Sequence, residues 1–272
     1  MSIKAKNNMI DINDLHNIKS IIDLAARRSA FYDEEFEEVI ETVYKIKDWI
    51  EETSNQTNPH ADPNRPMDTR ELGLETIGGP YRLSTLKRLV VEACNNAEGE
   101  VWELGVYKGG TASMISDELK VNNIVRELKF FDSFEGLPEL DEKDLASEFP
   151  HHKGEFGDPG IYETVCNYFA NDKNVQVIKG FVPDTLAGLE DSKIAFCHID
   201  LDLYEGYKST LEFVWPRLAV GGIIAFDDYF AIGSCQGAVV AVDEFLAEHS
   251  DVQLYTEGPS YDQASWIIKK YE

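Results

Sequence analysis

The chain has 272 residues, 43% of them hydrophobic, which is enough to bury one sizeable α/β core together with a helical extension. Its formal net charge of −25 argues against nucleic acid or an anionic membrane as a partner, because phosphate groups would repel such an acidic surface. The four cysteines are widely spaced, so we expect reduced thiols in a cytoplasmic protein. No long apolar run follows the amino terminus, and we expect neither a signal peptide nor a membrane span.

The amino-terminal part is predicted to be helical. Apolar residues recur at helical spacing between Phe36 and Ile50 in an otherwise acidic stretch, and residues 53–70 are rich in Pro and Asn. We therefore predict a helical extension with a linker in residues 1–70 and one main domain in residues 71–272. An amphipathic helix is expected near the start of the main domain, with an inner face formed by Leu86, Leu89, Val90 and Ala93.

A strand that turns through glycines into a helix follows. Residues 100–104 predict the strand, Gly105 and Gly109 lie in the turn, and the helix is expected from about Thr111. This order is typical of a nucleotide crevice. The spacing lacks the second close glycine of the dinucleotide fingerprint, which disfavours a pyrophosphate cofactor. A strand-to-helix turn also needs glycine for purely steric reasons, and that alternative stays open.

The next predicted strand, residues 128–131, ends in Asp132, 27 positions beyond Gly105. An acidic side chain at this place can accept hydrogen bonds from both hydroxyls of a ribose. A glycine turn with this carboxylate suits an adenosine ligand. Residues 136–160 then form a polar segment long enough to be a lid or to be disordered. His151 and His152 in it are interpreted as solvated loop residues rather than substrate contacts.

Acidic residues follow two short apolar runs that are typical of a parallel sheet. Asp200 and Asp202 come after residues 194–199, and the doublet at positions 227 and 228 comes after residues 221–226, with a helix predicted over residues 204–218 between them. Both sets therefore lie at the carboxyl ends of neighbouring strands, where carboxylates would repel one another unless a cation lay between them. Oxygen ligands select Mg²⁺, Ca²⁺ or Mn²⁺. Helix caps and turn formers are the alternative interpretation. His198 is either directed toward these acids or a hydrogen-bonded core histidine.

Five sequence motifs occur in order and together resemble the macrocin O-methyltransferase family over about residues 70 to 270. They are Glu103–Ala112, Phe131–Pro138, Gly180–Leu186, His198–Glu205 and Gly221–Tyr229. The resemblance implies a Rossmann-like class I methyltransferase sheet with helices on both faces, S-adenosylmethionine as the methyl donor and Mg²⁺, or Mn²⁺ in its place, as the metal. It also implies a homodimer or a larger homo-oligomer. The first seventy residues exceed the leader that is usual in this family, and Gly206-Tyr207 replaces its usual Ser-Thr.

The resemblance also implies roles for individual residues. It makes Asp200, Asp227 and Asp228 the metal ligands and Asp202 the general base. The cofactor contacts that it implies are Thr76, Glu103, Leu104, Gly105, Val106, Tyr107, Gly109, Asp132, Ser133, Gly180, Phe181 and Asp200. For Phe181, core packing is the alternative.

The predicted function is metal-assisted transfer of a methyl group from S-adenosylmethionine to a hydroxyl of a sugar or another vicinal diol. A divalent cation lowers the pKa of a coordinated oxygen, and Asp202 then accepts the proton. The acceptor itself stays open among a macrolide deoxysugar, a nucleotide sugar, a glycan and an aromatic diol. The alternative function is a Mg²⁺-dependent phosphatase of the haloacid-dehalogenase type, which also uses an Asp-x-Asp pair and an acidic doublet.

Overall fold

The computed structural model describes residues 74–158, 160–231, 233–259 and 262–270. The helices predicted before residue 54 and the predicted linker lie outside these ranges, so both stay predictions. Contacts between Cα atoms divide the chain after Arg65, and every described residue belongs to the second unit, residues 66–272. None of the helices in the described ranges is long and apolar enough to cross a membrane.

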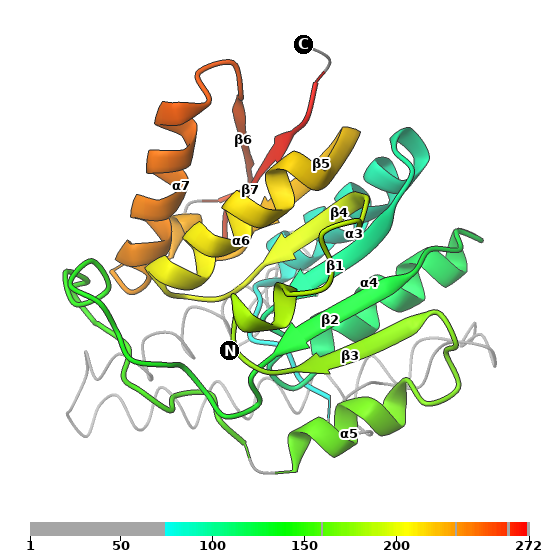
Figure 1. Ribbon diagram of the computed structural model, residues 1–272, viewed down its shortest axis with the longest axis horizontal. Coiled ribbons are helices and arrows are strands. Elements are labelled where there is room, and N and C mark those ends of the chain that lie inside the picture. The colour runs from blue at the N-terminus through cyan, green and yellow to red at the C-terminus, as the bar shows by residue number, and fades with distance from the viewer. Residues whose placement is uncertain (1–73, 159, 232, 260–261, 271–272) are drawn as a thin grey trace, which may run out of the picture. The chain divides into compact units, whose positions relative to one another are not determined.

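A seven-stranded sheet forms the centre of this unit, in the order β3-β2-β1-β4-β5-β7-β6 (Figure 1). Its strands are β1 (Glu100–Leu104), β2 (Leu128–Asp132), β3 (Val175–Lys179), β4 (Ile194–Ile199), β5 (Leu218–Phe226), β6 (Leu254–Glu257) and β7 (Ala264–Ile268). Strands β1 to β5 pair in parallel, whereas β7 is antiparallel to both β5 and β6. The strand order runs from β1 to β3 on one side and from β4 onward on the other, so it reverses between β1 and β4. A ligand crevice is expected where these two strands end.

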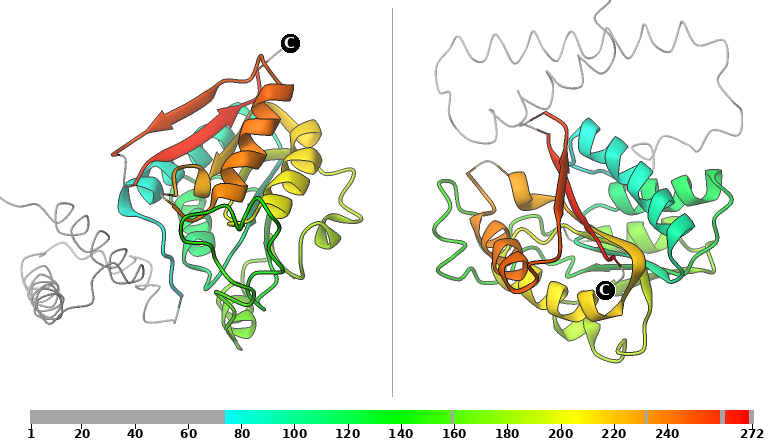
Figure 2. Two further views of the ribbon diagram at one scale, coloured as in Figure 1. Left: turned by 90° about the vertical axis from the view of Figure 1, so that its left-hand side faces the viewer. Right: turned by 90° about the horizontal axis from the view of Figure 1, so that it is seen from above.

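Helices cover both faces of the sheet, as predicted (Figure 2). They are α3 (Pro80–Asn96), α4 (Gly110–Val121), α5 (Ile161–Tyr168), α6 (Tyr204–Arg217) and α7 (Gln236–Glu248). One core cluster joins α3, α4 and α5 to the strand residues Val101, Phe130 and Phe196. The other joins α6 and α7 to their neighbours along the same strands, Trp102, Phe131 and Cys197. Successive strand residues point to opposite faces, which is why central strand β4 is buried along its whole length.

The predicted elements agree closely with the observed ones. β1 and β4 have the predicted bounds, and α4 begins one residue before Thr111. The helix predicted over residues 204–218 ends at Arg217, and β5 begins directly afterwards rather than at Gly221. In α3, the four residues predicted to form the inner face are all buried.

The segment between β2 and α5 has no helix or strand in its described residues, yet it is held by specific backbone hydrogen bonds. The Leu137 amide donates to Glu155 O at 2.9 Å, and the Gly154 amide donates to Leu137 O at 2.9 Å. Asp144 ties the segment to the start of α6, because its Oδ1 accepts the Tyr204 amide at 2.8 Å. The segment is therefore an ordered loop that contacts the carboxyl edge of the sheet.

Candidate active site

The glycine turn after β1 is fixed by the loop that follows β4. Gly105 has φ +95°, and a Cβ atom at this position would lie 1.6 Å from the Asp200 carbonyl oxygen. The Asp200 amide donates to Leu104 O at 2.8 Å, which holds the two loops together. Glycine is thus required here by the close approach of a second backbone, as the steric interpretation proposed. The same contact places the glycine turn against the first residue of the acidic cluster.

Asp132 closes the glycine turn from the neighbouring strand. Its Oδ2 accepts the backbone amides of Val106 and Tyr107, each at 2.8 Å, and its Oδ1 accepts the Phe134 amide at 2.6 Å. Burial raises the pKa of Asp132, and these three hydrogen bonds oppose that shift. The carboxylate therefore organises the turn through backbone contacts, a role that its spacing from Gly105 did not predict.

The other predicted cofactor residues lie around the same edge. The Ser133 hydroxyl belongs to a local turn, donating to Gly136 O at 2.9 Å and accepting the Glu135 amide at 3.1 Å. Thr76 shares a hydrogen bond of 2.8 Å with the hydroxyl of Thr111 in the first turn of α4. Gly109 precedes that helix with φ +80°. Gly180 follows β3, and Phe181 next to it is 38% exposed, which is inconsistent with core packing for this ring.

The four predicted carboxylates meet at the carboxyl ends of β4 and β5. Oxygens of Asp200, Asp202 and Asp228 lie within 4.8 Å of one another, and a second group of the same size joins Asp200 to Asp227 and His198. Asp200 belongs to both groups. The strand does not run through the first pair of acids, because β4 ends at Ile199 and Asp202 has φ +59°. The turn still brings the two side chains together.

The acidic cluster is only partly neutralised by the protein. Burial and the neighbouring carboxylates raise the pKa of Asp200 and Asp202 well above the usual range, and they raise that of Asp228 as well. Asp227 differs, because Arg82 and His198 outweigh the effect of burial and lower its pKa. Ionisation of three of the four carboxyl groups is thus less favourable here than in an exposed aspartate.

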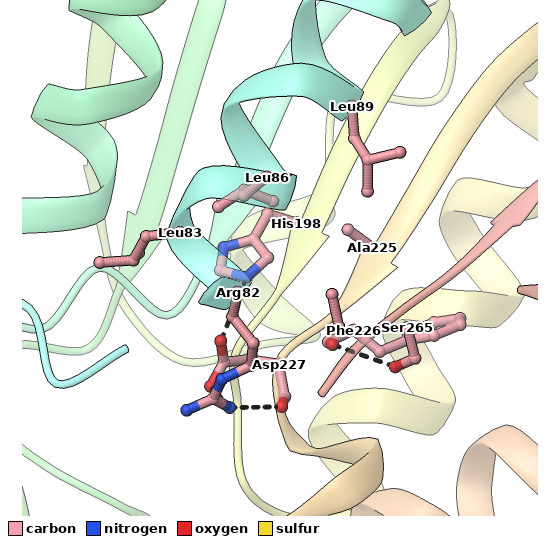
Figure 3. Close-up of a pocket in the computed structure, with 10 residues that line it drawn as sticks. Arg82, Leu83, Leu86, Leu89, His198, Ala225, Phe226, Asp227 and Ser265 are labelled. Carbon is pink, nitrogen blue, oxygen red and sulfur yellow. Dashed lines mark hydrogen bonds and ion pairs between the residues drawn. The ribbon is translucent and has the colours of Figure 1, made fainter. Parts of the chain in front are cut away.

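Arg82, in the first turn of α3, is a site residue that sequence reasoning missed. Its Nη1 donates to Asp227 Oδ2 at 2.6 Å and to Asp227 O at 2.7 Å, and its Nε lies 3.3 Å from Asp262 Oδ1. Figure 3 shows the guanidinium beside Asp227, at the mouth of a small cavity of about 20 Å³. Its only sequence signal was a basic residue at the start of the amphipathic helix.

His198 is a buried histidine between two carboxylates. Its Nδ1 lies 3.1 Å from Glu103 Oε1, and its Nε2 lies 3.7 Å from Asp227 Oδ1. Burial lowers its pKa, but the interactions with Asp227 and Glu103 outweigh this and raise the pKa to about 9. Glu103 is fully buried, and its Oε2 has no hydrogen-bond partner within the described part of the chain. Glu103, predicted as a cofactor contact, therefore supports the imidazolium that faces Asp227.

The prediction that both loop histidines are solvated is wrong for His151 and agrees with the structure for His152. His151 is only 14% exposed, its Nδ1 lies 3.1 Å from Glu155 Oε2, and its Nε2 lies 3.5 Å from Asp202 Oδ1. His152 is 79% exposed, as expected of a solvated residue. The loop brings His151 into the site because its own hydrogen bonds fold it back over Asp202, a long-range effect that no local pattern reveals.

The donor set fits a hard divalent cation. Carboxylate oxygens are the ligands that Mg²⁺ prefers, and burial together with the neighbouring carboxylates raises the pKa of Asp200 and of Asp228. The glycine turn after β1 lies beside them, and Phe181 presents an exposed ring after β3, an arrangement that fits an adenosyl group.

This sheet order, with a glycine turn after β1 and acidic loops after β4 and β5, defines a class I methyltransferase fold. The solved structure described as the O-methyltransferase NovP matches with a TM-score of 0.62 and 26% identity, over 72% of this chain and 82% of that one. The calicheamicin methyltransferase CalS11 has the same fold, with a TM-score of 0.60 and 23% identity, over 88% of this chain and 94% of that one.

Residues 18–253 match the model of the macrocin-O-methyltransferase (TylF) family, and the chain belongs to this family. The match begins well before residue 70, so the idea that the first seventy residues exceed the family's leader is wrong. The chain is an O-methyltransferase that uses S-adenosylmethionine, as the resemblance implied.

Two relatives are named for the reactions they catalyse. An 8-demethyl-8-(2,3-dimethoxy-alpha-L-rhamnosyl)-tetracenomycin-C 4'-O-methyltransferase from Streptomyces olivaceus is 31% identical over 189 residues, which are 66% of this chain and 72% of the relative. A demethyldecarbamoylnovobiocin O-methyltransferase from Streptomyces niveus is 29% identical over 181 residues, which are 64% of this chain and 68% of the relative. Neither relative supports the alternative of a phosphatase.

Proposed function

We propose that this enzyme methylates a hydroxyl of a sugar, or of a similar vicinal diol, with the help of Mg²⁺ held by Asp200, Asp227 and Asp228. Mn²⁺ would serve in its place. The observation that carries the proposal is the meeting of four carboxylates beside the glycine turn, three of them with a raised pKa. Such a cluster is costly unless a cation is bound.

Asp200 is central to the metal proposal because it belongs to both carboxylate groups. Asp228 is already oriented, since its Oδ2 accepts the Asp202 amide at 3.0 Å and the Tyr207 hydroxyl at 2.9 Å. Arg82 holds the outer oxygen of Asp227 and leaves its other oxygen facing His198. When bound, Mg²⁺ would lower the pKa of an acceptor hydroxyl that coordinates it.

Asp202 is proposed as the proton acceptor. Burial and the charge of Asp228 raise the pKa of this carboxyl group, which makes it a stronger base than an ordinary aspartate. In the reaction, the acceptor oxygen attacks the methyl carbon, the carbon–sulfur bond of the sulfonium breaks, and the hydroxyl proton passes to Asp202. The left-handed turn at Asp202 directs its carboxylate toward Asp228 and the loop rather than along the strand.

The cofactor is proposed to lie along the ends of β1, β2 and β3. Its contacts would be the residues implied by the family resemblance, namely Thr76, Glu103, Leu104, Gly105, Val106, Tyr107, Gly109, Asp132, Ser133, Gly180, Phe181 and Asp200. The contact between Gly105 and the Asp200 backbone supports this placement, because it sets the turn directly beside the acidic cluster. Most of the rate enhancement would then come from positioning the acceptor oxygen against the methyl group.

The acceptor class follows from the relatives and from charge. One relative is named for a rhamnosyl substrate, and carboxylates outnumber the cations at the site, which favours a neutral sugar over an anionic one. The test measures S-adenosylhomocysteine release with a neutral rhamnoside and with the matched deoxy-rhamnoside that lacks one hydroxyl of the diol. We expect turnover with the diol alone, lost in EDTA and restored by Mg²⁺. Equal turnover of both sugars, or activity that survives EDTA, would contradict the proposal.

We further propose that the catalytic domain comprises residues 71–272 and that residues 1–70 contribute to a homodimer or larger assembly in the cytoplasm, without nucleic acid or membrane as a partner. The apolar stripe between Phe36 and Ile50 supports this assignment. Sedimentation of the full chain at micromolar concentration should give a mass of at least twice 30.7 kDa. A monomer at that concentration would contradict it.

A further inference from the structure

A second cluster of potential metal ligands shares Asp202 with the acidic cluster. It consists of His151 from the loop, Asp202, and Cys235 immediately before α7. The distance from His151 Nε2 to Cys235 Sγ is 3.5 Å, that from Cys235 Sγ to Asp202 Oδ1 is 3.4 Å, and that from His151 Nε2 to Asp202 Oδ1 is 3.5 Å. The three atoms form a nearly equilateral triangle.

These distances match one face of a tetrahedral zinc site. With bonds of about 2.0 to 2.3 Å and tetrahedral angles, the nitrogen, sulfur and oxygen ligands of Zn²⁺ are separated by about 3.4 to 3.6 Å. An imidazole, a thiol and one carboxylate are also the donors that favour zinc over magnesium, which prefers oxygen alone. Geometry and chemistry therefore agree on the kind of ion.

The surroundings of the triangle support metal binding. Glu155 Oε2 lies 3.1 Å from His151 Nδ1, so the ring presents Nε2 to the cluster while a carboxylate orients it from behind, an arrangement typical of zinc-bound histidines. The ring also packs against Phe156, with 5.4 Å between centroids. Cys235 is 4% exposed, so its sulfur is held in place by packing rather than free in solvent.

We propose that His151, Asp202 and Cys235 bind Zn²⁺ with three protein ligands and one open position, and that zinc bound there inhibits the enzyme. The inhibition rests on the proposed function, since the ion would occupy the oxygen of Asp202 that faces the loop and withdraw this residue from proton transfer. Binding forms a zinc–sulfur bond, and the thiol proton leaves to solvent. No atom changes oxidation state.

The binding test uses Co²⁺ as a spectroscopic substitute for zinc, added to the full-length protein in excess Mg²⁺. We expect a cobalt–thiolate charge-transfer band that saturates at one Co²⁺ per chain and is abolished by Zn²⁺. Cys235→Ser should remove the band and weaken Zn²⁺ binding by about 100-fold or more. Cys166→Ser, at a half-buried thiol outside the cluster, is the matched control and should keep both. His151→Gln should also lose the band while its circular dichroism stays that of the parent.

The activity test separates this site from the proposed function. Zn²⁺ should inhibit the parent enzyme in excess Mg²⁺, whereas Cys235→Ser should keep the basal turnover and resist zinc. Absence of a cobalt–thiolate band, or a band that persists in Cys235→Ser, would overturn the site. A band that depends on Cys235 together with turnover that is indifferent to zinc would uphold the site, and it would overturn both the inhibition and the role of Asp202 as the base.

Discussion

Two half-buried carboxylates on neighbouring parts of the same sheet edge are stabilised in different ways. Asp132, after β2, accepts three backbone amides. Asp200, after β4, faces other carboxylates and has a pKa raised far above the usual range. The first carboxylate is held by backbone amides within the fold, whereas the second faces like charges, and that is where we propose the cation. The edge after β2 is therefore organised by the backbone, and we propose that a bound cation organises the acidic edge.

The largest effect is expected from Asp200→Asn, which changes the acidic edge. The substitution removes a charge shared by both carboxylate groups, so we expect turnover to fall by about 10⁴-fold and Mg²⁺ to lose its stabilising effect. The metal-free variant should melt at a higher temperature than the parent, because a repulsive charge is gone. Asp191→Asn, at an exposed position, is the matched control and should change neither property. A metal-free variant that is less stable than the parent would contradict the description of the acidic edge.

Asp202→Asn should separate proton transfer from metal binding. An amide cannot accept the proton, and the expected loss in kcat is about 10²- to 10⁴-fold. Because the proposed ligands are Asp200, Asp227 and Asp228, the affinity for Mg²⁺ measured by calorimetry should change by no more than about twofold. If turnover is unchanged, Asp202 is not the base.

Asp132→Asn tests the other edge. One of the two oxygens that accept the Val106, Tyr107 and Phe134 amides becomes a donor, so the free energy of unfolding should fall by about 1 to 3 kcal/mol. Calorimetry should show weaker binding of S-adenosylmethionine and an unaltered affinity for Mg²⁺. Impaired metal binding in this variant would mean that the two edges are not independent.

The smallest expected effect is a change of the melting temperature with pH, first in the metal-free protein. Asp200 and Asp202 have raised pKa values, and that of His198 is raised to about 9, so each group binds protons more tightly in the folded state. The contribution of these groups to the free energy of unfolding is complete at low pH and is lost as pH rises through their folded-state pKa values. For His198 this loss falls between pH 6.5, its ordinary pKa, and about 9. The metal-free protein should melt a few degrees lower near pH 9 than near pH 6.

Magnesium competes with those protons, so the rise in melting temperature that it causes should be larger near pH 9 than near pH 6. Scanning calorimetry with and without Mg²⁺ measures both quantities. The proposed ligands must lose their protons to bind Mg²⁺. A larger rise in melting temperature near pH 6 than near pH 9 would therefore contradict their role as ligands.

Local sequence patterns predicted the strands and the meeting of the acidic residues, because parallel strands of a βαβ unit end at one edge. They did not predict Arg82 or His151 as site residues. Arg82 reaches Asp227 from a helix 145 positions earlier, and His151 reaches Asp202 through the fold of an irregular loop. Such contacts depend on tertiary packing, and no periodicity or spacing in the chain records them.

The contacts of Asp132 also could not be predicted from the sequence. Its place at the end of a strand was predictable, but its partners were not, since backbone amides leave no signal in a sequence. The left-handed turn at Asp202 was equally hidden, because aspartate has only a modest preference for that conformation.

The metal site is tested most directly by anomalous diffraction from crystals grown with S-adenosylhomocysteine and Mn²⁺. We expect one manganese peak among the carboxylates of Asp200, Asp227 and Asp228, beside the sulfur of the bound product. A crystal with S-adenosylhomocysteine in place and no peak among these three residues would contradict it.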